Sequence, residues 1–115
     1  MQIQFLNLYN GVMNVREERS ALIANNIANA NTPGFKAQDV SFGAALATQL
    51  ASPDAPVGPQ YRASTTVALD GNDVSLDGER IEAAQNAEQL SASATFLHQS
   101  TSDLITALRP NPSGT

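Results

Sequence analysis

The sequence predicts an all-α protein whose long N- and C-terminal helices pair as a coiled coil around an irregular or partly disordered middle segment. Apolar residues recur at three- and four-residue spacing near both ends of the chain, which is typical of amphipathic helices. Proline and glycine gather between these ends and interrupt regular structure. The 115 residues suffice for one domain, and with 5% aromatic residues a self-contained core would be thin.

Residues 4–30 are expected to form the first helix. An apolar stripe begins at Phe5 and reaches Leu22, interrupted by Arg19, and then shifts to Ile23, Ile27 and Ala30. With a rise of about 1.5 Å per residue, such a helix is roughly 40 Å long. That length is unusual in a small globule and ordinary in a coiled coil.

Asparagines dominate the end of this first helix, at Asn25, Asn26, Asn29 and Asn31. Carboxamides need hydrogen-bond partners when they are buried, so we expect this face to bond to groups outside its own chain. The alternative is a solvated, fraying helix end. The dipeptide Pro33-Gly34 then predicts a type II turn, because proline fixes φ and glycine tolerates a positive φ.

The middle segment, residues 36–74, is expected to be mostly irregular. A short helix over residues 41–51 is possible, with Ser41 as its N-cap. The proline-rich residues 52–60 favour a loop, residues 61–69 alternate like a short extended piece, and residues 70–73 form a turn.

The last long helix is predicted from about residue 75 to residue 108. Ser75 or Asp77 can cap its start, and Pro110 stops it after Arg109, which leaves residues 111–115 as a frayed tail. A seven-residue apolar repeat marks a coiled-coil seam, with small residues at its second position that allow close approach of a partner helix. The seam consists of Leu76, Ala83, Leu90, Leu97 and Leu104 with Ala87, Ala94, Thr101 and Leu108.

The two terminal helices can pair within one chain, as an intramolecular hairpin, or between chains. A two-helix coil cannot bury all of the apolar surface that these helices carry. We therefore expect association with copies or relatives, with the hairpin as the alternative.

The composition argues against nucleic-acid binding, metal binding and catalysis. The net charge of −5 and the scattered basic residues disfavour nucleic-acid binding, and the lack of cysteine excludes disulfides and thiolate sites. His98 is the only histidine, and residues 70–79 lack the ligand spacing of a calcium loop. We expect no catalytic residues, no cofactor, no metal and no small-molecule substrate. No cleavable signal peptide or membrane helix is expected either.

Residues 24–37 closely resemble the N-terminal signature of the bacterial flagellar rod and hook protein family. A second block, residues 69–80, resembles the stretch before the C-terminal helix of one class of proximal rod subunit, and Asp39 also fits that class. Ser75, Gly78 and Leu90 depart from its usual residues. The signature residues, which are the expected subunit-interaction residues, are Asn25, Asn26, Ile27, Ala28, Asn29, Asn31, Thr32, Pro33, Gly34 and Phe35.

The resemblance implies a structural subunit of the basal body that builds the proximal rod across the periplasm. It implies export, without cleavage, through the flagellar type III apparatus, and an inner-tube domain formed by residues 1–35 and 75–110. The implied partners are copies of the chain, other rod proteins, the rod adaptor FliE, the membrane ring and the export gate.

Three other functions remain open at this point. Another proximal rod protein, of the FlgC type, is the nearer alternative, and the block at residues 69–80 argues against it. A small helical export chaperone or adaptor is the alternative from another class. An enzyme such as a wall hydrolase is a distant third, because no catalytic acid in a cleft is evident.

Overall fold

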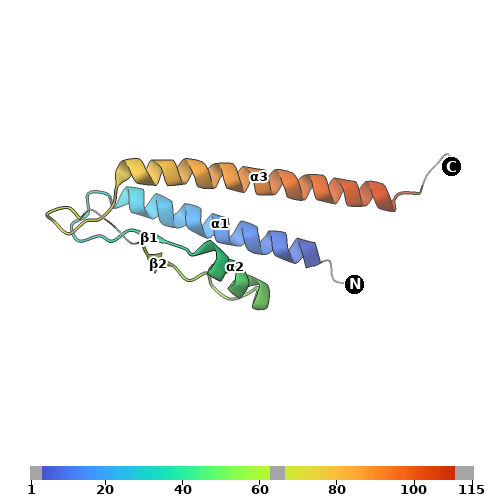
Figure 1. The fold of residues 1–115 in the computed structure, drawn as a ribbon, viewed down its shortest axis with the longest axis horizontal. Helices are drawn as coiled ribbons and strands as arrows, with labels where there is room; N and C mark the ends of the chain where they lie inside the picture. The colour runs from blue at the N-terminus through green and yellow to red at the C-terminus, as the bar shows by residue number, and fades with distance from the viewer. Residues whose placement is uncertain (1–3, 63–66, 111–115) are drawn as a thin grey trace.

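The computed structural model describes residues 4–62 and 67–110. Two long helices, α1 (Gln4–Ala28) and α3 (Leu76–Leu108), run antiparallel and side by side, so that the start of α1 and the end of α3 lie toward the same end of the molecule (Figure 1). The shorter α2 (Phe42–Ala51) packs on α1. The predicted fold class is thereby confirmed, with long terminal helices and a short irregular middle.

Helix ends follow local chemistry. α1 ends at Ala28, two residues earlier than expected. The hydroxyl oxygen of Ser75 accepts a hydrogen bond from the Gly78 N–H at 3.2 Å, which confirms Ser75 as the N-cap of α3. Arg109 is the C-cap of α3, directly before Pro110. The tail expected for residues 111–115 lies outside the described residues.

The middle segment folds back along α1 and is more regular than predicted. α2 begins and ends within a residue of the expected helix, and Ser41 is its N-cap residue as predicted, although the Ser41 side chain makes no capping hydrogen bond. Two-residue strands, β1 (Gln38–Asp39) and β2 (Gln60–Tyr61), pair antiparallel. Of the extended piece expected over 61–69, residues 63–66 lie outside the description and residues 67–69 form no strand.

The apolar core is small and lies on the α2 side of α1. Val15, Leu22, Val40 and Ala45 form it, and Phe42 and Val57 pack against it. α2 packs closely against α1 at Gly11, where an added Cβ would lie 3.1 Å from a methyl carbon of Leu46. α2 covers one side of α1, and α3 packs on another side of it. The contacts between α1 and α3 are more polar than those of this apolar core.

Polar side chains fill much of the contact between α1 and α3. Asn26 from α1 and Glu79 and Asn86 from α3 are at most 1% exposed. A buried polar group is tolerated only when it is hydrogen bonded. Their hydrogen-bond partners define the candidate site.

Membrane spanning is not indicated by any of the helices among the described residues, because none combines sufficient length with sufficient hydropathy.

Candidate functional site

The two segments that carry the family resemblance lie against each other where α1 ends and α3 begins. We call residues 29–37 and 67–74 together the double turn. Asn72, which is 4% exposed, donates from its carboxamide to the carbonyl oxygens of Asn29 at 2.8 Å and Thr32 at 2.6 Å. Both carbonyls lie just after the end of α1 and also accept a backbone N–H, from Thr32 and from Phe35 respectively. Asn72 thus adds a second hydrogen bond to each carbonyl, from a segment 40 or more residues away.

Backbone bonds continue the contact between the two halves of the double turn. The Gly34 N–H donates to the carbonyl of Asp70 at 2.8 Å, and the Asp73 N–H donates to the carbonyl of Phe35 at 3.1 Å. The Lys36 ammonium donates to the carbonyl of Gly71 at 2.7 Å. The double turn is therefore one hydrogen-bonded unit.

The predicted turn at Pro33-Gly34 is confirmed. The Phe35 N–H donates to the carbonyl of Thr32 at 3.2 Å, and Gly34 has φ of 73°, as a type II turn requires at that position. Gly71 has φ of 85°, and a Cβ added there would lie 3.3 Å from the Gly34 Cα. Two glycines that are far apart in sequence thus allow the two backbones to touch.

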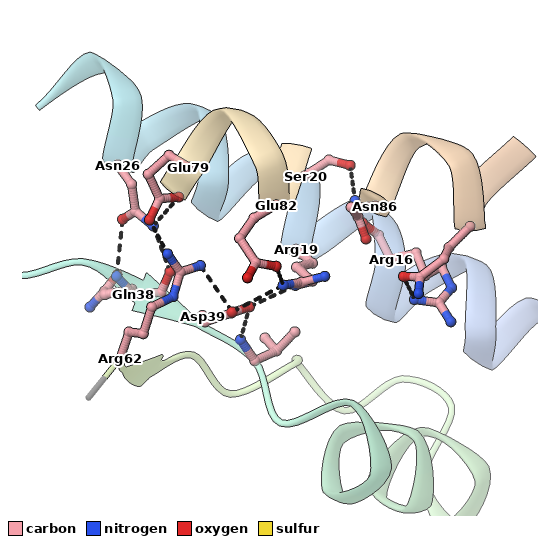
Figure 2. A network of polar contacts seen from close by, with 12 residues as sticks. Arg16, Arg19, Ser20, Asn26, Gln38, Asp39, Arg62, Glu79, Glu82 and Asn86 are labelled. Carbon is pink, nitrogen blue, oxygen red and sulfur yellow. Dashed lines mark hydrogen bonds and ion pairs between the residues drawn. The ribbon is translucent and has the colours of Figure 1, made fainter. Parts of the chain in front are cut away.

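Asn26 bonds within its own chain, so the expectation of an outside partner is wrong for this residue. Its carboxamide donates to the Gln38 carbonyl at 2.8 Å and to Glu79 Oε2 at 3.2 Å, and its oxygen accepts from the Gln38 N–H at 3.0 Å. The side chain is 0% exposed. Asn26 therefore joins α1, β1 and α3 (Figure 2).

The other signature residues are divided between the chain and the surface. Asn29 donates to the Asn25 carbonyl at 2.8 Å and accepts from the Thr32 hydroxyl at 3.0 Å, so its carboxamide is also used locally. Ile27 and Phe35 are half-buried. The exposed residues are Asn25, Ala28, Asn31, Thr32, Pro33 and Gly34.

A network of charged side chains joins the helices to the two strands (Figure 2). Arg62 forms ion pairs with Glu79, whose side chain is 1% exposed, and with Asp39 at 3.0 Å. Arg19 forms ion pairs with Asp39 at 2.9 Å and with Glu82. Two arginines and three carboxylates therefore connect α1, β1 and α3 with Arg62, the residue directly after β2.

The network also determines the ionisation of Asp39. Burial opposes the charged form, but hydrogen bonds from Arg19, the Val40 N–H and Arg62 outweigh burial and lower the pKa of Asp39 below its usual value. In the opposite sense, the hydrogen bond to Asp39 raises the pKa of Arg19. Both groups are charged at neutral pH.

Sequence reasoning missed this network. In the sequence, Arg19 interrupts an apolar stripe and the basic residues are scattered along the chain, so neither pattern indicates a shared network. A charged residue on the buried face of an amphipathic helix was the available signal, because a buried arginine requires a carboxylate. The identity of that carboxylate depends on folding of the middle segment onto α1, which sequence spacing does not specify.

A second polar contact lies further along α1 and α3. The Asn86 carboxamide donates to the carbonyl of Arg16 at 3.1 Å and to the Ser20 hydroxyl at 2.6 Å. The Arg16 guanidinium donates to Gln89 Oε1 at 2.8 Å and lies over the Phe42 ring, 4.3 Å from its centroid. Arg16 is therefore held by an amide and a ring.

The predicted seam of α3 is divided between two environments. Ala83, Leu90, Leu97, Thr101 and Leu104 are half-buried. Leu76, Ala87, Ala94 and Leu108 are exposed. The position buried against α1 next to Ala87 is Asn86, one residue earlier. The exposed members have no partner helix within the described chain, so their packing stays a prediction.

Comparison with known proteins gives a consistent result. The profile of the family described as "Flagella basal body rod protein" matches residues 13–36. The flagellar basal body rod protein FlgB of Cereibacter sphaeroides is 38% identical over 110 residues, covering 83% of this chain and 86% of that protein. FlgB of Aeromonas hydrophila is 35% identical (84% and 86% covered), and FlgB of Escherichia coli K12 is 33% identical (74% and 78% covered).

Proposed function

Because this chain belongs to the FlgB family of flagellar basal body rod proteins, we propose that it builds the proximal rod by packing its terminal helices against neighbouring subunits. Its identity as a basal body rod component follows from the family. The mode of assembly is the proposal, and it depends on the surfaces that the folded chain leaves uncovered.

The observation that supports this proposal is the uncovered apolar surface of α3. Ile105 is 50% exposed and Leu108 is 75% exposed, and the small seam residues Ala87 and Ala94 are exposed on the same helix. A heptad seam is stable only when a second helix covers it. Since α1 covers other positions, a helix from a neighbouring subunit is the partner proposed for this surface.

The lengths of the two helices support the same conclusion. Tyr9 packs against Phe96, with ring centroids 5.4 Å apart, and Arg16 bonds to Gln89. An advance of seven residues along α1 therefore corresponds to seven residues backwards along α3, as expected for an antiparallel pair. α3 therefore extends past Gln4, where α1 begins, as Figure 1 shows. The last turns of α3 lack an α1 partner among the described residues and are available to a neighbour.

We propose that residues 1–35 and 75–110 form the inner-tube domain and that residues 36–74 are a linker segment packed on its surface. In this arrangement the double turn redirects the chain between the two helices. Asn25 and Asn31, which are exposed, are the signature carboxamides available to neighbours. Asn26 and Asn29 preserve the fold instead.

Assembly would order the chain ends. Helices gain most of their stability from tertiary packing, and the far ends of α1 and α3 lie outside the small core formed around Val15 and Leu22. The partners expected for the ordered ends are copies of the chain, other rod proteins, FliE, the membrane ring and the export gate. The chain would reach them through the type III apparatus without cleavage.

Deletion of the gene, with motility scoring and electron microscopy of basal bodies, tests the proposal. Loss of motility with rods missing or truncated at the membrane ring is the expected result. The variant I105D/L108D should reproduce this defect, and S102D/T106D, which adds two charges at neighbouring polar positions, is its matched control. Motile deletion cells with intact rods would refute the proposal.

A further inference from the structure

We propose that Arg16 forms an ion pair with Glu88 of a neighbouring copy, and that this contact sets the register of side-by-side subunits in the rod. The inference rests on the proposed function, because it names the residues of one subunit contact. Arg16, Arg19 and Arg62 each bond to a side chain of α3, but they differ in the charge of their partners.

Arg19 and Arg62 each bind two carboxylates of their own chain, whereas Arg16 binds none among residues 4–62 and 67–110. The difference arises in α3. Arg19 meets Glu82, and Arg16 meets Gln89, which occupies the equivalent position one heptad later. α3 therefore offers Arg16 a neutral amide where it offers Arg19 a carboxylate.

Arg16 is also prepared to receive an anion. Stacking over Phe42 and the bond to Gln89 hold its guanidinium in place, so little conformational entropy remains to be lost when a carboxylate binds. The Nε–H of Arg16 is buried without a hydrogen-bond partner among the described residues. Burial and the nearby Arg19 charge lower the pKa of Arg16, which is the cost that a carboxylate partner would offset.

The chain as a whole favours such a contact. Each copy carries a net charge of −5, so identical subunits repel one another unless cations of one copy face anions of the next. Glu88 is exposed and forms no ion pair within the described chain. It is therefore available to a cation from outside.

Glu88 has the position that the contact requires. Glu88 lies two positions after Asn86, which bonds to α1, and two positions before the half-buried Leu90, so helical geometry places Glu88 on the side of α3 away from α1. It follows that one copy cannot pair its own Arg16 with its own Glu88. Glu88 precedes Gln89, the residue that Arg16 contacts, so the two charges lie at nearly the same height along the molecule.

Copies placed side by side in the same orientation would thus present Arg16 on one flank and Glu88 on another. Such a contact is heterologous, meaning that it uses two different surfaces and generates rings or helical tubes. Glu88 also lies at one end of a shallow groove of about 610 Å³ on α3, which includes the Phe96 ring. This groove gives the neighbouring flank an apolar surface beside the charge.

Cysteine cross-linking tests the contact directly, because the chain has no cysteine of its own. A deletion strain would express two single variants, R16C and E88C, and its basal bodies would be oxidised. We expect a disulfide-linked dimer at twice the chain mass of 12.1 kDa, absent when either variant is expressed alone. The matched control pairs E17C with E88C. A dimer yield no greater than that of the control would overturn the proposal.

Charge reversal supplies a test in the assembled motor. R16E and E88R should each abolish swimming, and R16E/E88R should restore it. The variant R16E/E17R has the same net charge as R16E/E88R and should stay non-motile. Circular dichroism of each purified variant verifies its helix content. Rescue by both double variants, or normal swimming of R16E, would overturn the contact, whereas motility of the deletion strain itself would refute the proposed function.

Discussion

Gly34 and Gly71 meet backbone to backbone, and a Cβ added to Gly71 would lie 3.3 Å from the Gly34 Cα. Both residues have positive φ, which non-glycine residues rarely adopt. This contact places the carbonyl of Asp70 within 2.8 Å of the Gly34 N–H. The two glycines therefore determine whether the double turn can close.

Replacing Gly71 with alanine should destabilise the chain by about 1–3 kcal/mol, because the strained φ and the short contact add. Gly43→Ala is the matched control, since Gly43 lies in α2 with ordinary φ and open space around it. That control should be neutral or stabilising by up to about 1 kcal/mol. Urea unfolding followed by circular dichroism measures both, and equal effects would contradict the close contact.

Replacing Arg62 with methionine should destabilise the chain by about 3–5 kcal/mol, because Glu79 is then left as a buried carboxylate without a cation. R62M/E79M should recover much of this loss by removing the unpaired charge. Arg80→Met is the control, because Arg80 and Asp77 form a solvent-exposed pair 3.7 Å apart. Its cost should stay below about 1 kcal/mol. A small effect of R62M would show that the network contributes little.

Asn26→Leu should cost about 2–4 kcal/mol, since both the N–H and the carbonyl of Gln38 lose their partner. Asn25→Leu changes an exposed neighbour and should alter stability by no more than about 0.5 kcal/mol. A swimming assay distinguishes the variants N25L and N26L further. If Asn25 contacts a neighbouring subunit, N25L swims poorly while its free energy of unfolding is unchanged. Equal destabilisation by N25L and N26L would refute the assignment.

The contribution of Asp39 to stability should depend on pH. Its pKa is lower in the folded chain than in the unfolded chain, where a value of about 3.9 applies. The stabilisation is therefore complete above that pH and disappears as the pH falls through the lower pKa of the folded state. The gap in free energy of unfolding between the wild type and D39N should be largest near neutrality and should narrow below about pH 4. A constant gap would contradict the lowered pKa.

Amides in the last turns of α3 should exchange rapidly with solvent in the free chain, because α1 does not cover them. Amides near Glu79 and Asn86, which are buried, should exchange more slowly. In isolated basal bodies the last turns should become protected. Hydrogen exchange with mass spectrometry measures both states. A free monomer that is fully helical and melts in one sharp cooperative transition would argue against ordering on assembly.

Local patterns in the sequence predicted the helices and the turn. Leu8, Val15 and Leu22 repeat every seven residues, and this spacing indicates a helix whatever the helix packs against. Ser75 before Leu76 indicated where α3 begins, and Pro33-Gly34 indicated the turn. Each of these features depends on residues that lie close together along one segment of the chain, so it can be predicted without knowledge of the tertiary structure.

The tertiary structure decided which polar groups became partners. Asn26 was expected to bond outside the chain, because nothing in the sequence brings Gln38 and Glu79 to it. The fold does so by turning the chain at Gly34 and returning the middle segment along α1. A carboxamide or a carboxylate has no intrinsic preference among distant partners. Only the closed double turn therefore assigns Asn26, Glu79 and Arg62 to one another, and within the described part of the chain it leaves Arg16 without a carboxylate.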